Sequence, residues 1–172
     1  ITAEVSPHHL YFNDNDIMNY DTNLKVAPPI RSEENRQALI QGLKDGSIDC
    51  VATDHAPHRI EEKETTFDIA SCGMIGLESC FGAMNKVLCK DNGFKLEKVI
   101  ELITVNPRKI MQFNQDLFAL DSLAEITIID HKKEWKFSKK DIKSKAKNSA
   151  FIGNRLSGKI LHTISKNFLS SN

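Results

Sequence analysis

The chain has 172 residues, of which 40% are hydrophobic and 27% are charged, a composition typical of a globular protein. Its 23 basic and 23 acidic residues give a formal net charge of zero, which argues against nucleic acid as a main partner. The four cysteines lack CxxC spacing, which argues against a disulfide scaffold and a structural zinc site and favours a reduced, cytoplasmic setting. Because the sequence has no apolar run of about 18 residues, we expect no membrane span.

The first residues predict a strand followed by a long loop. Residues 1–6 combine β-branched and small side chains and end before Pro7, a pattern typical of a strand. The sequence begins inside this strand without an initiator methionine, so we expect a fragment of a longer protein. Residues 7–31 hold clusters of Asn and Asp without periodicity, which predicts a long loop of the kind that often carries function.

A helix and a buried strand are expected next. Ser32 is suited to cap the start of a helix, and Gly46 stands where its C-terminal cap is expected. Residues 48–53 are nearly all apolar or small, which is typical of a strand in a parallel sheet covered on both faces.

The remainder predicts helices and then strands. Apolar residues recur at helical spacing over 77–88 and again over 96–103, after a polar loop at 55–71. Asn106 and Pro107 predict the start of a third, short helix, with the asparagine as its cap. Strands are then expected over 124–130 and 158–164.

This order of elements predicts an α/β fold. Alternating strands and helices indicate parallel βα units. Two such units are too few to close a sheet, and a (β/α)8 TIM barrel is the expected parent because its chemistry lies on the loops that follow the strands.

Asp54, His55 and His58 follow the strand predicted over 48–53. At the C-terminal end of a barrel strand, the Asp54 carboxylate could bind a metal such as zinc or transfer a proton. His58 could reach the same pocket as a hydrogen-bond donor or a second ligand. The spacing by itself leaves open a turn-forming aspartate and surface histidines.

A longer motif resembles a known family. The run "ATDHAPH" at 52–58, preceded by "PPIRSEENRQALIQGLKDGSID" at 28–49, is similar to the C-terminal half of the dihydroorotases, of the class I bacterial type. The runs "ITAEVSPHHL" and "VNPRKI" and the tail "KEWKFSKKDIKSKAKNSAFIG" agree with it. The resemblance implies a metal-dependent hydrolase of pyrimidine biosynthesis that interconverts N-carbamoyl-L-aspartate and L-dihydroorotate. It further implies that residues 1–120 form the C-terminal part of an amidohydrolase barrel and residues 121–172 a β-rich segment.

The resemblance also implies roles for individual residues. Asp54 matches an aspartate that binds zinc and shuttles a proton, with one or two ions whose other ligands are expected upstream. His58 matches a substrate-binding histidine, and Gly73 a position whose backbone contacts the substrate. Two residues depart from the family pattern: Ala27 stands where an asparagine binds the substrate, and Cys72 where a phenylalanine is usual.

Other candidates receive structural roles. His8 and His9 follow the first strand, where direct contact with a metal is one alternative. The resemblance places the family's metal histidines upstream, so we expect these two to organise the loop. His55 is expected to support its own loop. Cys72 has no paired base near it in sequence, which favours a packing residue over a nucleophile.

Three functions remain open. The first is a dihydroorotase, expected to be a homo-oligomer and inactive when reduced to this segment. The second is a non-catalytic dihydroorotase-like partner of aspartate transcarbamoylase, which Ala27 and Cys72 favour. The third is a related cyclic amidase, a hydantoinase or an allantoinase, against which the motif at 52–58 argues.

Overall fold

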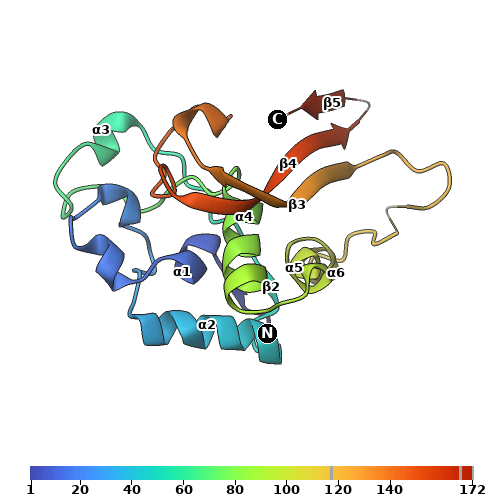
Figure 1. The fold of residues 1–172 in the computed structure, drawn as a ribbon, viewed down its shortest axis with the longest axis horizontal. Coiled ribbons are helices and arrows are strands. Elements are labelled where there is room, and N and C mark those ends of the chain that lie inside the picture. The colour runs from blue at the N-terminus through green and yellow to red at the C-terminus, as the bar shows by residue number, and fades with distance from the viewer. Residues whose placement is uncertain (117, 167, 172) are drawn as a thin grey trace.

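A computed structural model describes residues 1–116, 118–166 and 168–171 of the chain (Figure 1). The first half contains β1 (Glu4–Val5), α1 (Pro7–Tyr11), the 3-10 helices η1 (Asp14–Ile17) and η2 (Thr22–Leu24), α2 (Glu33–Asp45), β2 (Cys50–Val51) and α3 (Ile60–Lys63). The second half contains α4 (Cys80–Met84), the π-helix η3 (Asn85–Asp91), α5 (Leu96–Ile103), α6 (Val105–Ile110), β3 (Ile126–Lys136), η4 (Lys139–Asp141), β4 (Arg155–Ser165) and β5 (Phe168–Ser171).

The strands form two separate sheets. β1 and β2 pair in parallel, with Glu4 opposite Cys50 and Val5 opposite Val51. β3, β4 and β5 form an antiparallel sheet in that order. The parallel pairing confirms the βα arrangement expected from the sequence, and no closed barrel is present within the described residues. None of their helices is long and apolar enough to cross a membrane.

Two groups of buried side chains make up the core. One lies around β1 and β2 and joins them to α1, α2, α4, η3 and α5; its fully buried members include Leu10, Leu43 and Leu88. Figure 1 accordingly shows α4 between α2 and the antiparallel sheet.

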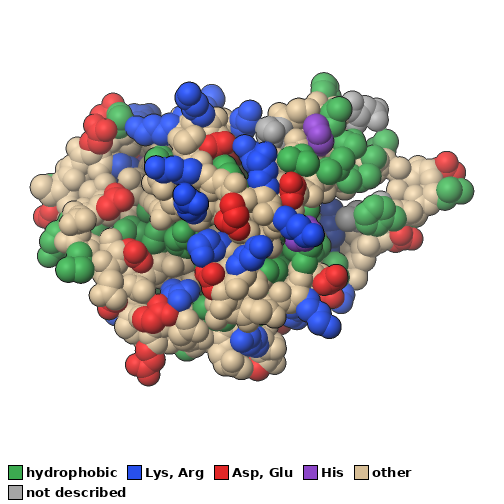
Figure 2. Space-filling view, in the orientation of Figure 1, with side chains coloured by type: hydrophobic (Ala, Val, Ile, Leu, Met, Phe, Trp, Pro, Cys, Tyr) green, Lys and Arg blue, Asp and Glu red, His purple; other side chains and the backbone are tan. Residues whose placement is uncertain are grey.

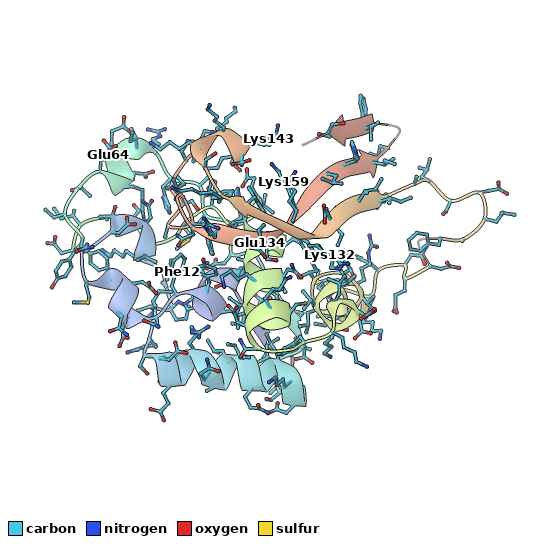
Figure 3. The ribbon with its side chains drawn as sticks, in the orientation of Figure 1. Phe12, Glu64, Lys132, Glu134, Lys143 and Lys159 are labelled. Carbon is cyan, nitrogen blue, oxygen red and sulfur yellow. The ribbon has the colours of Figure 1, made fainter. Side chains whose placement is uncertain are left out.

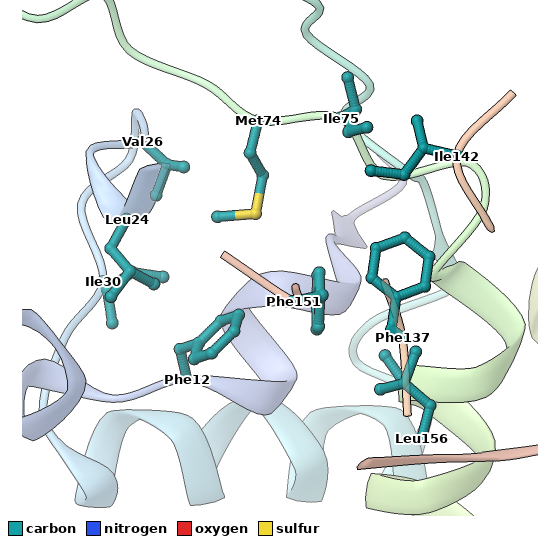
Figure 4. Close-up of a cluster of buried hydrophobic side chains, with 11 residues drawn as sticks. Phe12, Leu24, Val26, Ile30, Met74, Ile75, Phe137, Ile142, Phe151 and Leu156 are labelled. Atoms are coloured by element: carbon teal, nitrogen blue, oxygen red, sulfur yellow. The ribbon is translucent and has the colours of Figure 1, made fainter. Parts of the chain in front are cut away.

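The second group joins segments that lie far apart in the sequence (Figure 4). It includes Phe12 and Leu24 from the loop after α1, Met74 from the central loop, and Phe137 and Phe151 from the last third of the chain. Phe12 follows α1 directly and is also labelled in Figure 3. The last third therefore packs on the loops that leave the two parallel strands.

One group of exposed apolar side chains lies at the opposite end of the molecule. Figure 2 shows them where β4 and β5 meet and along the loop between α6 and β3. They include Phe118, Leu120, Leu123, Phe168 and Leu169.

The predicted helix caps of α2 are confirmed. The Ser32 hydroxyl accepts a hydrogen bond from the backbone N–H of Asn35. Gly46 adopts a left-handed conformation with a φ of 84°, which glycine tolerates without steric cost. The strand predicted at 124–130 begins two residues late and continues further as β3, and the strand predicted at 158–164 lies within the longer β4.

Three local predictions were wrong in detail. The expected loop at 7–31 contains α1, which has only five residues and is too short to show a periodic pattern. The helix expected over 77–88 begins at Cys80 and changes to a π-helix at Asn85. The last short helix starts at Val105, because the Asn106 side chain donates to the Asp49 carbonyl 2.7 Å away instead of capping the helix.

Candidate functional site

Asp54 and His8 meet at the end of the parallel strands. Asp54 lies three residues beyond Val51 of β2, and His8 lies three residues beyond Val5 of β1. Because Val5 and Val51 are paired, the segments that follow β1 and β2 leave the sheet at the same edge. His8 and Asp54 are therefore the same number of residues beyond that pair. The Nε2 atom of His8 lies 3.5 Å from an Asp54 carboxylate oxygen.

The two partners differ strongly in exposure. The Asp54 side chain is 50% exposed, whereas that of His8 is 1% exposed. Asp54 also has a φ of 47°, a left-handed conformation that is uncommon for residues other than glycine. Non-glycine residues held in this conformation cluster at functional sites.

His8 is buried without compensation. Neither ring nitrogen has a hydrogen-bond partner among the described residues. Burial, together with the neighbouring charge of His9, lowers the pKa of His8 from 6.5 to about 3. The imidazole is therefore neutral at pH 7, with one N–H donor and one lone pair.

His9, by contrast, has both ring nitrogens engaged. Its Nε2 lies 2.8 Å from the carbonyl oxygen of Pro28, and its Nδ1 lies 2.6 Å from the Ser6 hydroxyl. A carbonyl only accepts, so Nε2 carries the proton and the Ser6 hydroxyl donates to Nδ1. His9 thereby ties the end of β1 to the loop that begins at Ala27, where the Ala27–Pro28 peptide is cis.

A cavity of about 770 Å³ opens beside this edge. Asp54 and Ala27 both line it, together with His9, Arg31 and Arg36. Arg36 is already paired with Glu33, at 2.6 Å. The structure thus brings two of the sequence-predicted site residues, Asp54 and Ala27, to one cavity.

His58, Cys72 and Gly73 form a second group. The Nε2–H of His58 donates to the Cys72 carbonyl at 2.8 Å, and the Cys72 side chain is exposed. The backbone N–H of Gly73 donates to the Lys25 carbonyl at 2.8 Å. His58 lines a separate cavity of about 720 Å³.

Gly73 is required by the local backbone. Its φ is 121°, and a Cβ at this position would lie 2.5 Å from the Cβ of Ala56. Only glycine fits such an approach without displacing its neighbour.

Two residues that the sequence did not single out hold this group in place. The ammonium of Lys63, a residue that is 5% exposed, donates to the carbonyls of Ser71 and Gly73 at 2.7 and 3.0 Å. Burial lowers the pKa of Lys63. The Asn148 side chain accepts from the His58 backbone and donates to the Ala56 carbonyl. Asn148 lies in the tail that resembles the family, but neither residue carries a motif of its own.

His55 supports the same region, as expected. Its Nδ1 accepts from the backbone N–H groups of Gly76 and Leu77, at 3.1 and 3.4 Å. A parallel bridge between His55 and Met74 runs beside these bonds.

These residues do not form a complete metal site. Across residues 1–116, 118–166 and 168–171, no group of three His, Cys, Asp or Glu side chains could hold an ion. The Asp54 carboxylate nevertheless suits a hard or borderline cation, and it is accessible. The described residues therefore offer one ligand, the Asp54 carboxylate, to a metal centre.

Two solved structures share the fold of this chain. The L-hydantoinase of Arthrobacter aurescens matches with a TM-score of 0.83 and 24% identity, over 99% of this chain and 39% of that one. An inactive dihydroorotase-like domain of the Chaetomium thermophilum CAD-like multifunctional protein matches with a TM-score of 0.66 and 15% identity, over 98% and 43%. The chain therefore has the fold of about two fifths of each of these two proteins.

The sequence comparisons are more specific. No family model matches. The dihydroorotase of Caldicellulosiruptor saccharolyticus is 41% identical over 156 residues, which are 91% of this chain and 36% of that protein. The dihydroorotase of Elusimicrobium minutum is 43% identical over 163 residues, or 95% and 38%. The chain is a homologue of the dihydroorotases, as its motifs predicted, and spans little more than a third of the length of these relatives.

Proposed function

We propose that the protein containing this chain is a dihydroorotase, a zinc-dependent hydrolase that reversibly cyclises N-carbamoyl-L-aspartate to L-dihydroorotate. The observation that carries the proposal is the place of Asp54, an exposed carboxylate at the end of a parallel strand in a chain more than 40% identical to dihydroorotases. The whole protein's activity remains a proposal because the chain covers 36% of the first of these relatives.

In this proposal Asp54 has two tasks. One carboxylate oxygen binds zinc, as one ligand of a site that holds one or two ions and draws its other ligands from the rest of the protein. When bound, the metal polarises the amide carbonyl and lowers the pKa of the attacking water. The Asp54 carboxylate accepts the proton of that water and returns it to the departing ring nitrogen. Ring closure is the reverse.

The substrate is bound by the second group of residues and by the loop at Ala27. His58 binds the substrate carboxylate. To do so, its Nε2–H gives up the hydrogen bond to the Cys72 carbonyl and donates to the substrate instead. The backbone N–H and carbonyl of Gly73 are already bonded to the Lys25 carbonyl and the Lys63 ammonium. Gly73 therefore contacts the substrate through the surface of its backbone and not through hydrogen bonds. Ala27 provides no side-chain donor and Cys72 no aromatic wall, so this enzyme binds the ring more weakly than relatives with Asn and Phe there.

The fold proposal goes with the function. Residues 1–120 belong to the C-terminal part of a (β/α)8 barrel, which the parallel pairing of β1 and β2 supports. Residues 121–172 belong to a small β-rich domain, which the antiparallel sheet β3–β4–β5 supports. A homo-oligomer in the cytoplasm remains our expectation from the sequence.

A non-catalytic role is the second candidate. Ala27 and Cys72 both remove substrate contacts expected of the family, and one protein of similar fold is described as inactive. Such a protein would bind and organise aspartate transcarbamoylase instead of turning over substrate. A hydantoinase is less well supported, because the hydantoinase matched here is 24% identical whereas the dihydroorotases reach 41% and 43%.

The test uses the full-length protein with zinc. Asp54→Asn keeps the size of the side chain but removes the charge and the proton acceptor. We expect the rate of carbamoyl-aspartate cyclisation to fall at least ~100-fold, because a positioned acid–base group contributes about 10²–10⁴-fold. Asp68→Asn, at a fully exposed aspartate outside the cavity, is the control. Equal rates for wild type and Asp54→Asn would exclude the role of Asp54. An inactive wild type that still binds aspartate transcarbamoylase would favour the second candidate.

A further inference from the structure

His8 is the buried polar side chain that the proposed reaction leaves unexplained. It is 1% exposed and both of its ring nitrogens lack partners within the described part of the chain. Buried polar groups are nearly always hydrogen-bonded, and the exceptions require an explanation. The anionic group paired with it is the Asp54 carboxylate, whose Oδ2 lies 3.5 Å from Nε2.

The backbone aims the two side chains at each other. The strands β1 and β2 are paired at Val5 and Val51, and each chain runs three residues further before reaching His8 or Asp54. Pro7 starts α1 directly after β1, which turns His8 inward as one of the buried residues of this helix. His8 is enclosed among the buried residues of α1, whereas the half-exposed Asp54 has room to rotate.

The neighbouring histidine does not compete for this contact. The rings of His8 and His9 lie 4.6 Å apart, centroid to centroid. The nitrogens of His9 are already occupied by Ser6 and Pro28. Of the pair, only His8 has a donor available.

We propose that His8 is a positioning residue for the metal centre: its Nε2–H donates to Oδ2 of Asp54 and leaves Oδ1 to the metal. This inference rests on the proposed function, since it assumes that Asp54 binds the ion. A small rotation of the Asp54 carboxylate shortens the observed 3.5 Å to the ~2.8 Å that is usual for hydrogen bonds to carboxylates. Such outer partners fix the orientation of a ligand and typically alter metal affinity 10–100-fold.

The test measures zinc affinity of the full-length protein by competition with a chelator, and the visible spectrum of its Co²⁺ form. His8→Leu removes the donor and should weaken zinc binding ~10–100-fold and change the Co²⁺ spectrum. His8→Gln keeps an amide N–H near Nε2 and should stay within about threefold of wild type. His162→Leu, at a histidine of β4 bonded to Ser171, is the control and should change neither readout.

Three results would overturn the inference. His8→Leu could bind zinc as tightly as wild type with an unchanged spectrum. His8→Gln could lose metal as completely as His8→Leu, which would make His8 a direct ligand. In an Asp54→Asn background His8→Leu could still weaken binding by its full factor, whereas coupling through Asp54 predicts little further loss.

A measurement on the wild type guards against variants that do not fold. NMR of protein with ¹⁵N-labelled histidine reports which ring nitrogen carries the proton. We expect the His8 proton on Nε2 in the wild type, and we expect the Nε2 signal to shift in Asp54→Asn. A proton on Nδ1, or a metal-bound Nε2, would contradict the proposal. A wild type without zinc affinity would remove the proposed function as well. Loss of zinc in Asp54→Asn with unchanged zinc affinity in His8→Leu would leave the function standing and remove only the role of His8.

Discussion

The edge formed by His8 and Asp54 differs from the loop formed by residues 71–73. At the edge, polar groups are left incomplete: buried His8 has no hydrogen-bond partner in the described part of the chain, and Asp54 is half exposed in a left-handed conformation. In the loop, polar groups are saturated: Lys63 and Asn148 occupy its carbonyls, and His58 donates to Cys72. The loop is therefore a preorganised support, whereas under our proposal the edge is completed by the metal ion that Asp54 binds. Stability and binding should therefore respond differently to substitutions in the two regions.

The largest effect on stability is expected at Gly73. Gly73→Ala should lower the free energy of unfolding by about 3 kcal/mol, because strain at positive φ adds to the approach of the new Cβ to Ala56. Gly93→Ala is a matched control, since Gly93 also has a positive φ, of 70°, but nothing lies within 4 Å of its Cβ position. Chemical denaturation of both variants measures the difference. Equal losses would show that the loop is less tightly packed than described.

Lys63 gives the next effect. Lys63→Met keeps the apolar stem but leaves the Ser71 carbonyl without its donor and the Gly73 carbonyl with only the 3.4 Å bond from Asn148, which should cost about 2 kcal/mol of unfolding free energy. Lys98→Met, which removes only a surface pair with Glu101 at 4.0 Å, should change stability by less than about 0.5 kcal/mol. A thermal melt compares the two. Similar melting temperatures would mean that Lys63 does not hold the loop.

In the cavity beside the His8–Asp54 edge, Ala27→Asn should strengthen substrate binding. The new amide would offer the donor that the family uses and lower KM for carbamoyl-aspartate about tenfold, equivalent to about 1.4 kcal/mol of binding. Ala38→Asn, on the α2 wall of the same cavity, is a matched control and should not lower KM. An unchanged KM in Ala27→Asn would place the substrate away from this loop.

The smallest effect is expected for the stability of His8→Leu. Replacing a buried, unpaired imidazole by an apolar side chain should leave unfolding free energy unchanged or raise it by up to about 1 kcal/mol. His9→Leu, one residue further, breaks hydrogen bonds to Ser6 and Pro28 and should cost about 2 kcal/mol. Denaturation curves distinguish the two neighbours. A strongly destabilised His8→Leu would mean that the His8 ring already makes hydrogen bonds in the free protein. The edge and the loop would then not differ in this respect.

Much of this protein could be predicted from local signals. The capping residues Ser32 and Gly46 marked the ends of α2, and the apolar run at 48–53 marked the strand before Asp54. The motif "ATDHAPH" and its flanks identified the dihydroorotase relationship that the sequence comparisons confirm. These features depend on residues close together in the chain, and the sequence displays such features directly.

Other features required the tertiary structure. The start of α6 at Val105 follows from a bond between Asn106 and Asp49, which lie 57 positions apart. The contact between His8 and Asp54 arises from the pairing of Val5 with Val51, which no local pattern encodes. The order of residues along the chain is enough to place side chains such as Asp54 and His8 after the ends of their strands. Only the packed structure decided which of them meet and which stay unpaired, because strand pairing and burial depend on contacts between distant segments.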